Sequence, residues 1–351
     1  MEKRWYLPMI CLLSIITICL NAFKRGGDND FVMTVAGKIL VTKMGLTLPH
    51  EHMVTDFGGA EDEDVTYTEQ EAISLFLPYL MKLKTSGVTT MVECTPSFIG
   101  KNVKLLKTLS KLSGLNIITN TGYYAAVGQK YLPAHALKET EKELAKRWTD
   151  DFTYGIDGTG IRPGFIKLGT DAAPLNQVAV KLVKAGAVTH LNTGLKIAIH
   201  TGSAEAAHEE ANILKHMGVD LSAFIWVHAQ NDRTGSVMVK LAKQGVWISL
   251  DGISEREDAL TNYISAIKKL KSEKLLHRLL LSQDDGFAVS RIAGKVKFDA
   301  YENGNKKPYT TLLSILKPRL LNGVLTQQEF EMITVINPGK AFSIERLPLN
   351  K

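Results

Sequence analysis

Eight short apolar runs constrain the fold of this chain more than any other feature of its sequence. From residue 46 onward they alternate with stretches that carry leucine or isoleucine at helical spacing, such as VKLLKTLSKLSG at residues 103–114. The runs cover residues 46–50, 88–93, 116–121, 164–168, 196–200, 224–228, 246–251 and 279–284. Strands that alternate with helices predict parallel βαβ units, and eight such units in about 300 residues predict a TIM (β/α)8 barrel.

The predicted fold class is therefore α/β, with a short N-terminal β-hairpin extension at residues 31–45. A doubly wound open sheet is the alternative, but no glycine-rich phosphate turn follows the first strand. Residues 286–310 form a long connection after the eighth run, and long loops on the C-terminal face of a barrel usually belong to the active site. We expect residues 23–351 to form a single domain.

The first 22 residues differ in composition from the rest of the chain. Lys3 and Arg4 precede an uncharged run at residues 5–22, and polar residues follow it. This pattern is typical of a secretory signal peptide cleaved after Ala22, and it predicts a secreted or periplasmic protein. An uncleaved membrane anchor is the alternative, although the run is marginal for a span, which needs about 20 apolar residues.

The charge pattern argues against a nucleic-acid partner. The 351 residues carry a net charge of +6, but basic and acidic side chains are interspersed, as in KETEKE at residues 138–143. Proteins that bind nucleic acid gather their basic residues on one face instead. Two of the three cysteines lie in the predicted signal peptide, so Cys94 would remain alone and no intramolecular disulfide is expected.

Six residues with side chains able to bind metal fall at or near the ends of the predicted strands. They are His50 and His52 in the first, Lys167 in the fourth, His200 in the fifth, His228 in the sixth and Asp284 in the eighth. Because TIM-barrel enzymes place their active sites at this end of the strands, we expect the six on one rim. Residues i and i+2 of a strand share a face, so His50 and His52 could reach one ion. Neutral imidazole suits zinc, iron, cobalt or nickel.

Lys167 is unusual because it lies in an apolar run, PGFIKLGTD, where an unpaired ammonium would be costly. Burial lowers the pKa of a lysine. The neutral amine can then add carbon dioxide and become a carbamate, whose two oxygens can bridge two metal ions. From this run alone, the favoured interpretation is a lysine whose amine reaches solvent or pairs with a carboxylate such as Asp171.

Six segments resemble, in chain order, the successive motifs of the phosphotriesterase family within the amidohydrolase superfamily. They are GLTLPHEH, GIRPGFIKLGTD, IAIHTG, WVHAQND, LLLSQDDGF and NPGKAF. LSKLSGLNIITNTGYY at residues 109–124 is similar to that family's third-strand region, and the similarity extends from about residue 33 to residue 345. As an ordered set, these motifs are highly specific for the family.

The resemblance implies two divalent metal ions, commonly zinc, with iron, cobalt or manganese also suited to such a site. By motif position, His50, His52 and Asp284 would hold the buried ion, His200 and His228 the more exposed one, and a carbamylated Lys167 would bridge both. Two such ions activate a bridging water near neutral pH. The implied reaction is therefore hydrolysis of an ester bond by a metal-bridging hydroxide, with Asp284 as the proton acceptor.

Two further residues are candidates for contact with the substrate. Tyr124 matches the position where lactonase-like members of the family place a tyrosine beside the metals, and packing at the strand end is the alternative. Asp285 would either contact polar groups of the substrate or face water. The expected partner is a small-molecule ester, with no nucleic acid and no stable membrane insertion after signal cleavage. A homodimer is common in the family.

Two departures from the family bear on the substrate. Phosphotriester-degrading members carry a histidine after the aspartate that closes strand 7, where this chain has Gly252 after Asp251. The acidic partner that follows the strand-6 histidine is replaced by Gln230 or Asn231. Because these side chains cannot titrate, a lactone or carboxylic ester is favoured over a phosphotriester. A mononuclear deaminase of the same superfamily and a non-catalytic metal-binding barrel are two further hypotheses for this chain.

Overall fold

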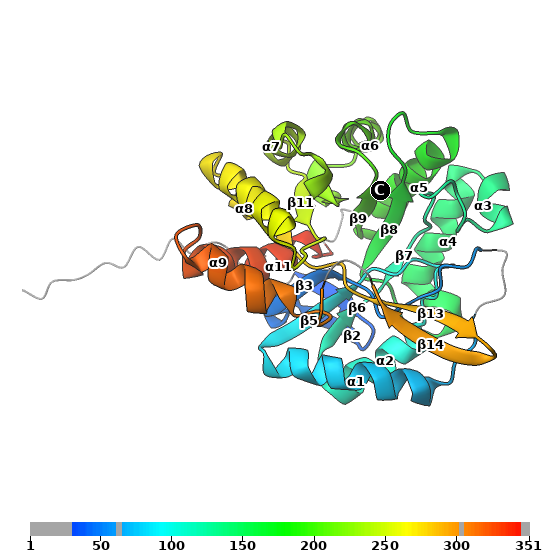
Figure 1. Ribbon diagram of the computed structural model, residues 1–351. Helices are drawn as coiled ribbons and strands as arrows, with labels where there is room; N and C mark the ends of the chain where they lie inside the picture. The colour runs from blue at the N-terminus through cyan, green and yellow to red at the C-terminus, as the bar shows by residue number, and fades with distance from the viewer. Residues whose placement is uncertain (1–29, 61–64, 302–304, 345–351) are drawn as a thin grey trace, which may run out of the picture.

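Strands and helices alternate along most of the chain in the computed structural model, which describes residues 30–60, 65–301 and 305–344 (Figure 1). The strands are β1 Phe31–Thr34, β2 Gly37–Leu40, β3 Leu46–Glu51, β4 Val54–Thr55, β5 Val88–Glu93, β6 Asn116–Ile118, β7 Asn120–Thr121, β8 Phe165–Thr170, β9 Lys196–Thr201, β10 Phe224–Val227, β11 Trp247–Leu250, β12 Leu279–Leu281, β13 Phe287–Ile292 and β14 Lys295–Ala300. The α-helices are α1 Glu69–Thr85, α2 Val103–Ser113, α3 Ala134–Lys138, α4 Glu141–Tyr154, α5 Gln177–Thr193, α6 Ala204–His216, α7 Ser236–Lys243, α8 Glu257–Ser272, α9 Lys317–Leu321, α10 Gln327–Glu331 and α11 Asn337–Ala341.

The predicted signal peptide, residues 1–22, lies outside the described residues. Within the described ranges, none of the helices combines the length and the apolar character needed to cross a bilayer. The predicted N-terminal hairpin is formed by β1 and β2, which pair antiparallel from Phe31 opposite Leu40 to Thr34 opposite Gly37.

Two parallel sheets contain the eight predicted runs. One has the order β3-β5-β6 and the other the order β7-β8-β9-β10-β11-β12. Only Thr119 separates β6 from β7, so the predicted third strand contributes to both sheets. At the outer edges, the backbone N–H of Asp284 donates to the carbonyl of His50 at 3.2 Å and brings the chain after β12 beside β3. The predicted α/β class is confirmed.

The local sequence sets the bounds of these elements. In β8, all six residues of FIKLGT are buried, as expected for a parallel strand covered on both faces. Helix α2 begins where the side chain of Asn102 accepts a hydrogen bond from the N–H of Leu105 at 3.1 Å. It ends at the C-cap Gly114, whose φ of 69° is left-handed, a conformation that glycine adopts without steric cost.

The connection after β12 has more structure than the predicted long loop. Strands β13 and β14 form an antiparallel hairpin that pairs Phe287 with Ala300 and Ile292 with Lys295. Ala293 and Gly294, with φ values of 49° and 78°, make its two-residue turn. Strand β13 also pairs in parallel with β4, so the hairpin extends over the segment that follows β3.

A buried carboxyl group joins the ends of β8 and β9. Glu210, on α6, is fully buried, and its two oxygens accept hydrogen bonds from the hydroxyls of Thr170 at 2.6 Å and Thr201 at 2.9 Å. These threonines are the last residues of the strands that carry Lys167 and His200. Burial raises the pKa of Glu210 to about 8, although both hydroxyl bonds favour the charged form.

We expect the free energy of unfolding of the variant Glu210→Gln to depend less on pH than that of the parent protein. The unfolded carboxyl ionises near pH 4.5, whereas the folded one keeps its proton until about pH 8. The folded state thus holds the extra proton between these values, so the free energy of unfolding falls as the pH rises, by at most roughly 1.4 kcal/mol per pH unit. Chemical denaturation at about pH 5 and about pH 8 should show a larger fall for the parent protein than for the variant. Equal falls would contradict this assignment.

Candidate metal centre

One cavity of about 170 Å³ gathers all the predicted metal-binding residues at the carboxyl ends of the parallel strands. Its lining includes His50, His52, Lys167, His200, His228 and Asp284, and the remaining residues are Thr55, Phe57, Pro96, Ile99, Tyr124, Val127, Tyr131 and Tyr301. The first set is polar and lies on the strands or within three residues of their ends. The second set comes mostly from the connecting loops and is mostly apolar or aromatic. The cavity therefore has a polar set of candidate ligands and largely apolar walls.

Asp284 makes the closest contacts within the set of candidate ligands. Its Oδ1 lies 3.3 Å from Nε2 of His50 and 3.1 Å from Nε2 of His52, and its Oδ2 lies 4.0 Å from Nε2 of His228. His50, His228 and Asp284 each offer one ligand atom, and these atoms lie within 4.8 Å of one another. The ring of His228 also lies 4.4 Å from that of His200, centroid to centroid, so His228 lies next to members of both sets that the resemblance implied.

Two of the candidate ligands have left-handed backbones. Asp284 has a φ of 56° and His228 a φ of 64°. Such values are uncommon outside glycine, and they tend to occur at functional sites, where the surrounding structure holds them. In Asp284 the conformation is held in part by the hydrogen bond that its N–H donates to His50.

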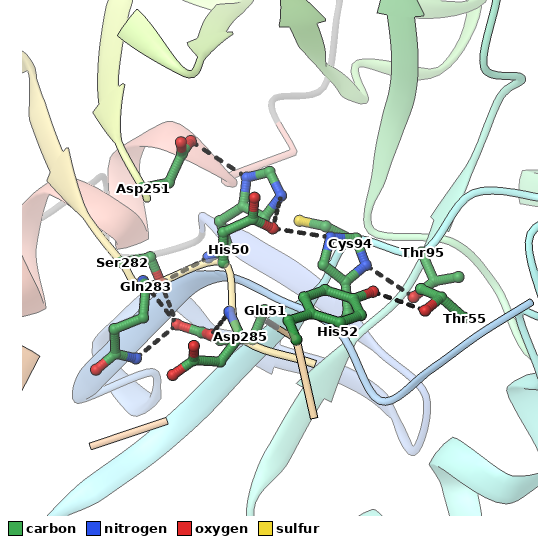
Figure 2. A network of polar contacts seen from close by, with 12 residues as sticks. His50, Glu51, His52, Thr55, Cys94, Thr95, Asp251, Ser282, Gln283 and Asp285 are labelled. Carbon is green, nitrogen blue, oxygen red and sulfur yellow. Dashed lines mark hydrogen bonds and ion pairs between the residues drawn. The ribbon is translucent and has the colours of Figure 1, made fainter. Parts of the chain in front are cut away.

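Asp251 orients two of the histidines from behind. It is fully buried just after β11, and its Oδ1 lies 2.7 Å from Nδ1 of His228. Its Oδ2 lies 3.2 Å from Nδ1 of His50, the contact drawn as a dashed line in Figure 2. A carboxylate at Nδ1 favours the tautomer in which Nε2 is free to bind a metal. Nδ1 of His52 lies 2.9 Å from the hydroxyl of Thr95, which can play the same part.

The charges around these histidines show what kind of group the site needs. Burial and Lys167 oppose protonation of His50, but Asp284 and Asp251 outweigh them and raise its pKa to about 9. Burial lowers the pKa of His52 to about 4. Burial disfavours charge on Asp284, yet the neighbouring histidines hold the pKa of that carboxyl well below its ordinary value. The carboxylates therefore draw a positive charge into the site, and this donor set fits a divalent metal ion.

Lys167 is buried within β8 and lines the cavity, with 2 % of its surface exposed. The structure does not place its amine at the protein surface. Asp171, the partner that the sequence suggested, instead directs its carboxylate at the backbone N–H groups of Val127 and Gly128. Lys167 therefore shares the cavity with the other candidate ligands, which is the position that a bridging carbamate would need.

Two glycines allow Tyr124 to lie beside the metal ligands. A Cβ at Gly122 would lie 2.3 Å from the carbonyl oxygen of Lys167, and a Cβ at Gly169 would lie 2.3 Å from the ring of Tyr124. The segment after β7 can therefore pack closely against β8. The ring of Tyr124 is 5.0 Å from that of His200, centroid to centroid. Burial raises the pKa of the Tyr124 hydroxyl, so it stays protonated and able to donate a hydrogen bond.

Asp285 lies in a buried network behind the cavity and neither lines it nor faces water. Its Oδ2 accepts a hydrogen bond from the N–H of Tyr309 at 2.7 Å, and its Oδ1 accepts one from Asn305 at 2.9 Å. Figure 2 shows its neighbour Glu51, whose Oε2 accepts from the N–H of Asp285 at 2.8 Å. The hydroxyl of Tyr309 donates to the carbonyl of His52 at 2.7 Å. Asp285 therefore supports the candidate ligands, and the geometry offers no contact with a substrate.

Sequence reasoning gave no role to Asp251, Thr95 or Tyr301. Asp251 is the last residue of one predicted strand and Thr95 follows another by two residues, on the same rim as the candidate ligands, and that position was a usable signal. Tyr301 follows β14, in a connection whose path the sequence does not fix. Its ring lies 5.8 Å from that of His52, and its hydroxyl donates to Thr55 at 2.8 Å.

The chain matches the phosphotriesterase family over residues 31–342. The phosphotriesterase homology protein of Escherichia coli strain K12 is 27 % identical over 300 residues, which cover 85 % of this chain and 98 % of that protein. An aryldialkylphosphatase of Saccharolobus solfataricus is 26 % identical over 210 residues, 59 % of this chain and 66 % of its own. An N-acetyltaurine hydrolase of Danio rerio is 25 % identical over 360 aligned positions, 88 % of this chain and 97 % of its own.

We expect Asp251→Asn to weaken zinc binding about 10- to 100-fold, the usual effect of losing a carboxylate behind metal-binding histidines. The amide presents one acceptor atom, so it cannot accept from both His50 and His228. Zinc content after dialysis against a graded chelator series measures the effect, with circular dichroism as the check on folding. The control is Asp258→Asn, because that side chain is 75 % exposed on α8. Equal zinc retention in the two variants would refute the assignment.

Proposed function

Because the chain belongs to the phosphotriesterase family, we propose that it is a binuclear metal-dependent hydrolase that cleaves a lactone or a carboxylic ester. The observation that carries the proposal is the convergence of four histidines, a buried lysine and an aspartate on one cavity. We also propose that the two parallel sheets close into one (β/α)8 barrel, which the hydrogen bond between Asp284 and His50 supports.

In the proposed reaction, His50, His52, His200, His228 and Asp284 would hold two divalent ions, with zinc preferred, and a carbamylated Lys167 would lie between them. When bound, the ions would supply Lewis acidity toward the substrate carbonyl and activate a water near neutral pH. Asp284 accepts the proton from the attacking water, because its environment keeps the carboxylate charged. Asp251 keeps His50 and His228 oriented through the reaction. The protonated hydroxyl of Tyr124 is positioned to donate a hydrogen bond to a substrate oxygen.

The residues around Asp251 favour an ester over a phosphotriester. The side chain of Gln230 donates to Asp251 Oδ1 at 3.2 Å and accepts from its backbone N–H at 3.3 Å. A Cβ at Gly252 would lie 2.9 Å from this amide and 3.0 Å from the hydroxyl of Tyr263, so a larger residue would need rearrangement there. Neither position can carry a proton away from Asp284. A carbonyl substrate depends less on such a relay than a phosphotriester does.

Hydrolysis of an acylated amine is the second candidate function, because N-acetyltaurine hydrolases are among the similar proteins. Amide and ester hydrolysis share attack on a carbonyl carbon, so the same donor set can serve both. The cavity provides little positive charge to bind the acidic group of an amine such as taurine. Among the described residues that line it, Lys167 is the only lysine or arginine, and it is one of the proposed metal ligands. The ester therefore stays the first choice.

A substrate panel on zinc-reconstituted protein tests the proposed function. It should include lactones of several ring sizes, p-nitrophenyl esters, a dialkyl aryl phosphotriester and N-acetyltaurine. We expect kcat/KM for the best lactone or ester to exceed that for the phosphotriester at least about tenfold. Preference for the phosphotriester would overturn the substrate assignment. Absence of turnover on the whole panel, with metal bound, would favour a binding protein, and one metal per chain would favour a mononuclear enzyme.

The variant Lys167→Ala should lose its metal and its activity, because it removes the only side chain on β8 that lines the cavity. If the lysine acts as a carbamate, then acetate or propionate should restore part of both, since a free carboxylate can occupy the vacated space. Metal analysis and turnover with and without the added carboxylate measure this. Full activity in the variant without added carboxylate would refute the role of Lys167.

A further inference from the structure

A turn at residues 125–131 forms part of the mouth of the cavity and has an unusual backbone. Val127, Gly128 and Gln129 have successive φ values of 59°, 63° and 68°. A left-handed backbone is disfavoured for most residues and is an outlier for a β-branched residue such as valine. Two hydrogen bonds within the turn support this conformation, from the N–H of Gln129 to the carbonyl of Ala125 at 3.2 Å and from the N–H of Lys130 to the carbonyl of Val127 at 3.3 Å. A further hold comes from outside the turn.

Asp171 supplies that hold. It follows directly after β8, and its Oδ1 accepts a hydrogen bond from the N–H of Val127 at 2.7 Å. Its Oδ2 accepts one from the N–H of Gly128 at 3.1 Å. Successive backbone N–H groups in such a turn form a concavity that binds anions, and here the chain's own carboxylate occupies it. Hydrogen bonds to a carboxylate are stronger than those to a neutral acceptor.

The C-terminal end of the turn is hydrogen-bonded to the segment that follows β4. The carbonyl of Lys130 accepts a hydrogen bond from the N–H of Ala60 at 3.2 Å. The amine of Lys130 donates to the carbonyl of Phe57 at 2.7 Å. The turn is thus held between two loops, and Asp171 supplies the only carboxylate that any described contact directs at its N–H groups.

This turn controls the shape of the cavity entrance. Val127 and Tyr131 both line the cavity, and Val127 remains 58 % exposed at its mouth. The ring of Tyr131 lies 5.9 Å from that of Tyr124, which lies beside His200. Asp171 itself is absent from the lining. Its effect on a substrate would therefore pass through the turn.

We propose that Asp171 is a positioning residue that determines substrate size, because its two hydrogen bonds hold Val127 and Tyr131 across the mouth of the cavity. The class of substrate that this mouth favours is a neutral ester with a compact acyl group. The substrate class rests on the proposed function, whereas the hydrogen bonds by which Asp171 holds the turn do not depend on it.

Three variants and a control separate these roles. Asp171→Ala removes both hydrogen bonds, and Asp171→Asn leaves one acceptor atom in place. Val127→Gly leaves Asp171 untouched, relieves the left-handed valine and removes its side chain from the mouth, so it serves if the first two variants fold poorly. The control is Asp150→Asn, on the surface of α4, where Asp150 pairs only with Lys146 among the ion pairs that the described residues form.

The first readout is hydrogen–deuterium exchange of the amides at residues 127 and 128. We expect exchange to accelerate at least about tenfold in Asp171→Ala and less in Asp171→Asn, with core amides unchanged. The second readout is kinetic, on zinc-loaded protein with p-nitrophenyl acetate and p-nitrophenyl hexanoate. The ratio of kcat/KM for hexanoate to that for acetate should rise about tenfold in Asp171→Ala and in Val127→Gly, mainly through KM. Zinc content should not change.

Unaltered exchange at residues 127 and 128 in Asp171→Ala would overturn the proposal. Faster exchange with an unchanged substrate ratio would also overturn it, because the mouth would then not depend on the turn. Loss of zinc in Asp171→Ala would assign the residue to the metal centre instead. If the parent protein cleaves no lactone or ester of the substrate panel, the proposed function fails, and the exchange experiment alone decides whether Asp171 holds the turn.

Discussion

Two carboxylates, the fully buried Asp251 and the partly buried Asp284, are the constraint on which the site depends. Removing an isolated carboxylate from water costs on the order of several kcal/mol, and a nearby positive charge must offset that cost. Asp284 and Asp251 raise the pKa of His50 to about 9, so its protonated ring supplies this charge when no metal is bound. A divalent ion replaces that proton with a larger charge. The folded chain thus holds negative charge that needs a cation to complete it, and this is the physical reason to regard the cluster as a metal centre.

The rest of the fold keeps these charges in place at some conformational cost. Asp284 and His228 adopt left-handed backbones, and Gly122 and Gly169 leave room for Tyr124 to lie against β8. Behind the ligands, Glu51 lies in a fully buried network of hydrogen bonds that includes Ser282, 231 residues further along the chain. These contacts join β3 to the segment after β12. A substitution in either segment would therefore disturb the candidate ligands in both segments.

The sequence predicts the strands and the gathering of the candidate ligands in one cavity because both depend on local signals. Each strand is a short apolar run, and parallel strands must place their carboxyl ends on one edge, so His200 and His228 could be assigned to a common rim. Contacts between distant segments leave no such signal. The hydrogen bonds of Asp285 to Tyr309 and Asn305 cross a connection whose path depends on tertiary packing. The hairpin of β13 and β14 did carry a signal, an Ala-Gly turn between alternating residues, but the prediction of a long loop made no use of it.

In the proposed function, metal binding and substrate recognition depend on different parts of this chain. The candidate ligands lie on strands or within three residues of their ends, close to the regular hydrogen bonding of the sheets. The walls of the cavity come mostly from loops, and their positions depend on single contacts such as those of Asp171 with Val127 and Gly128. A substitution in a loop can therefore change which substrate fits without displacing a ligand. The loops, more than the ligands, would then decide the reaction of this chain.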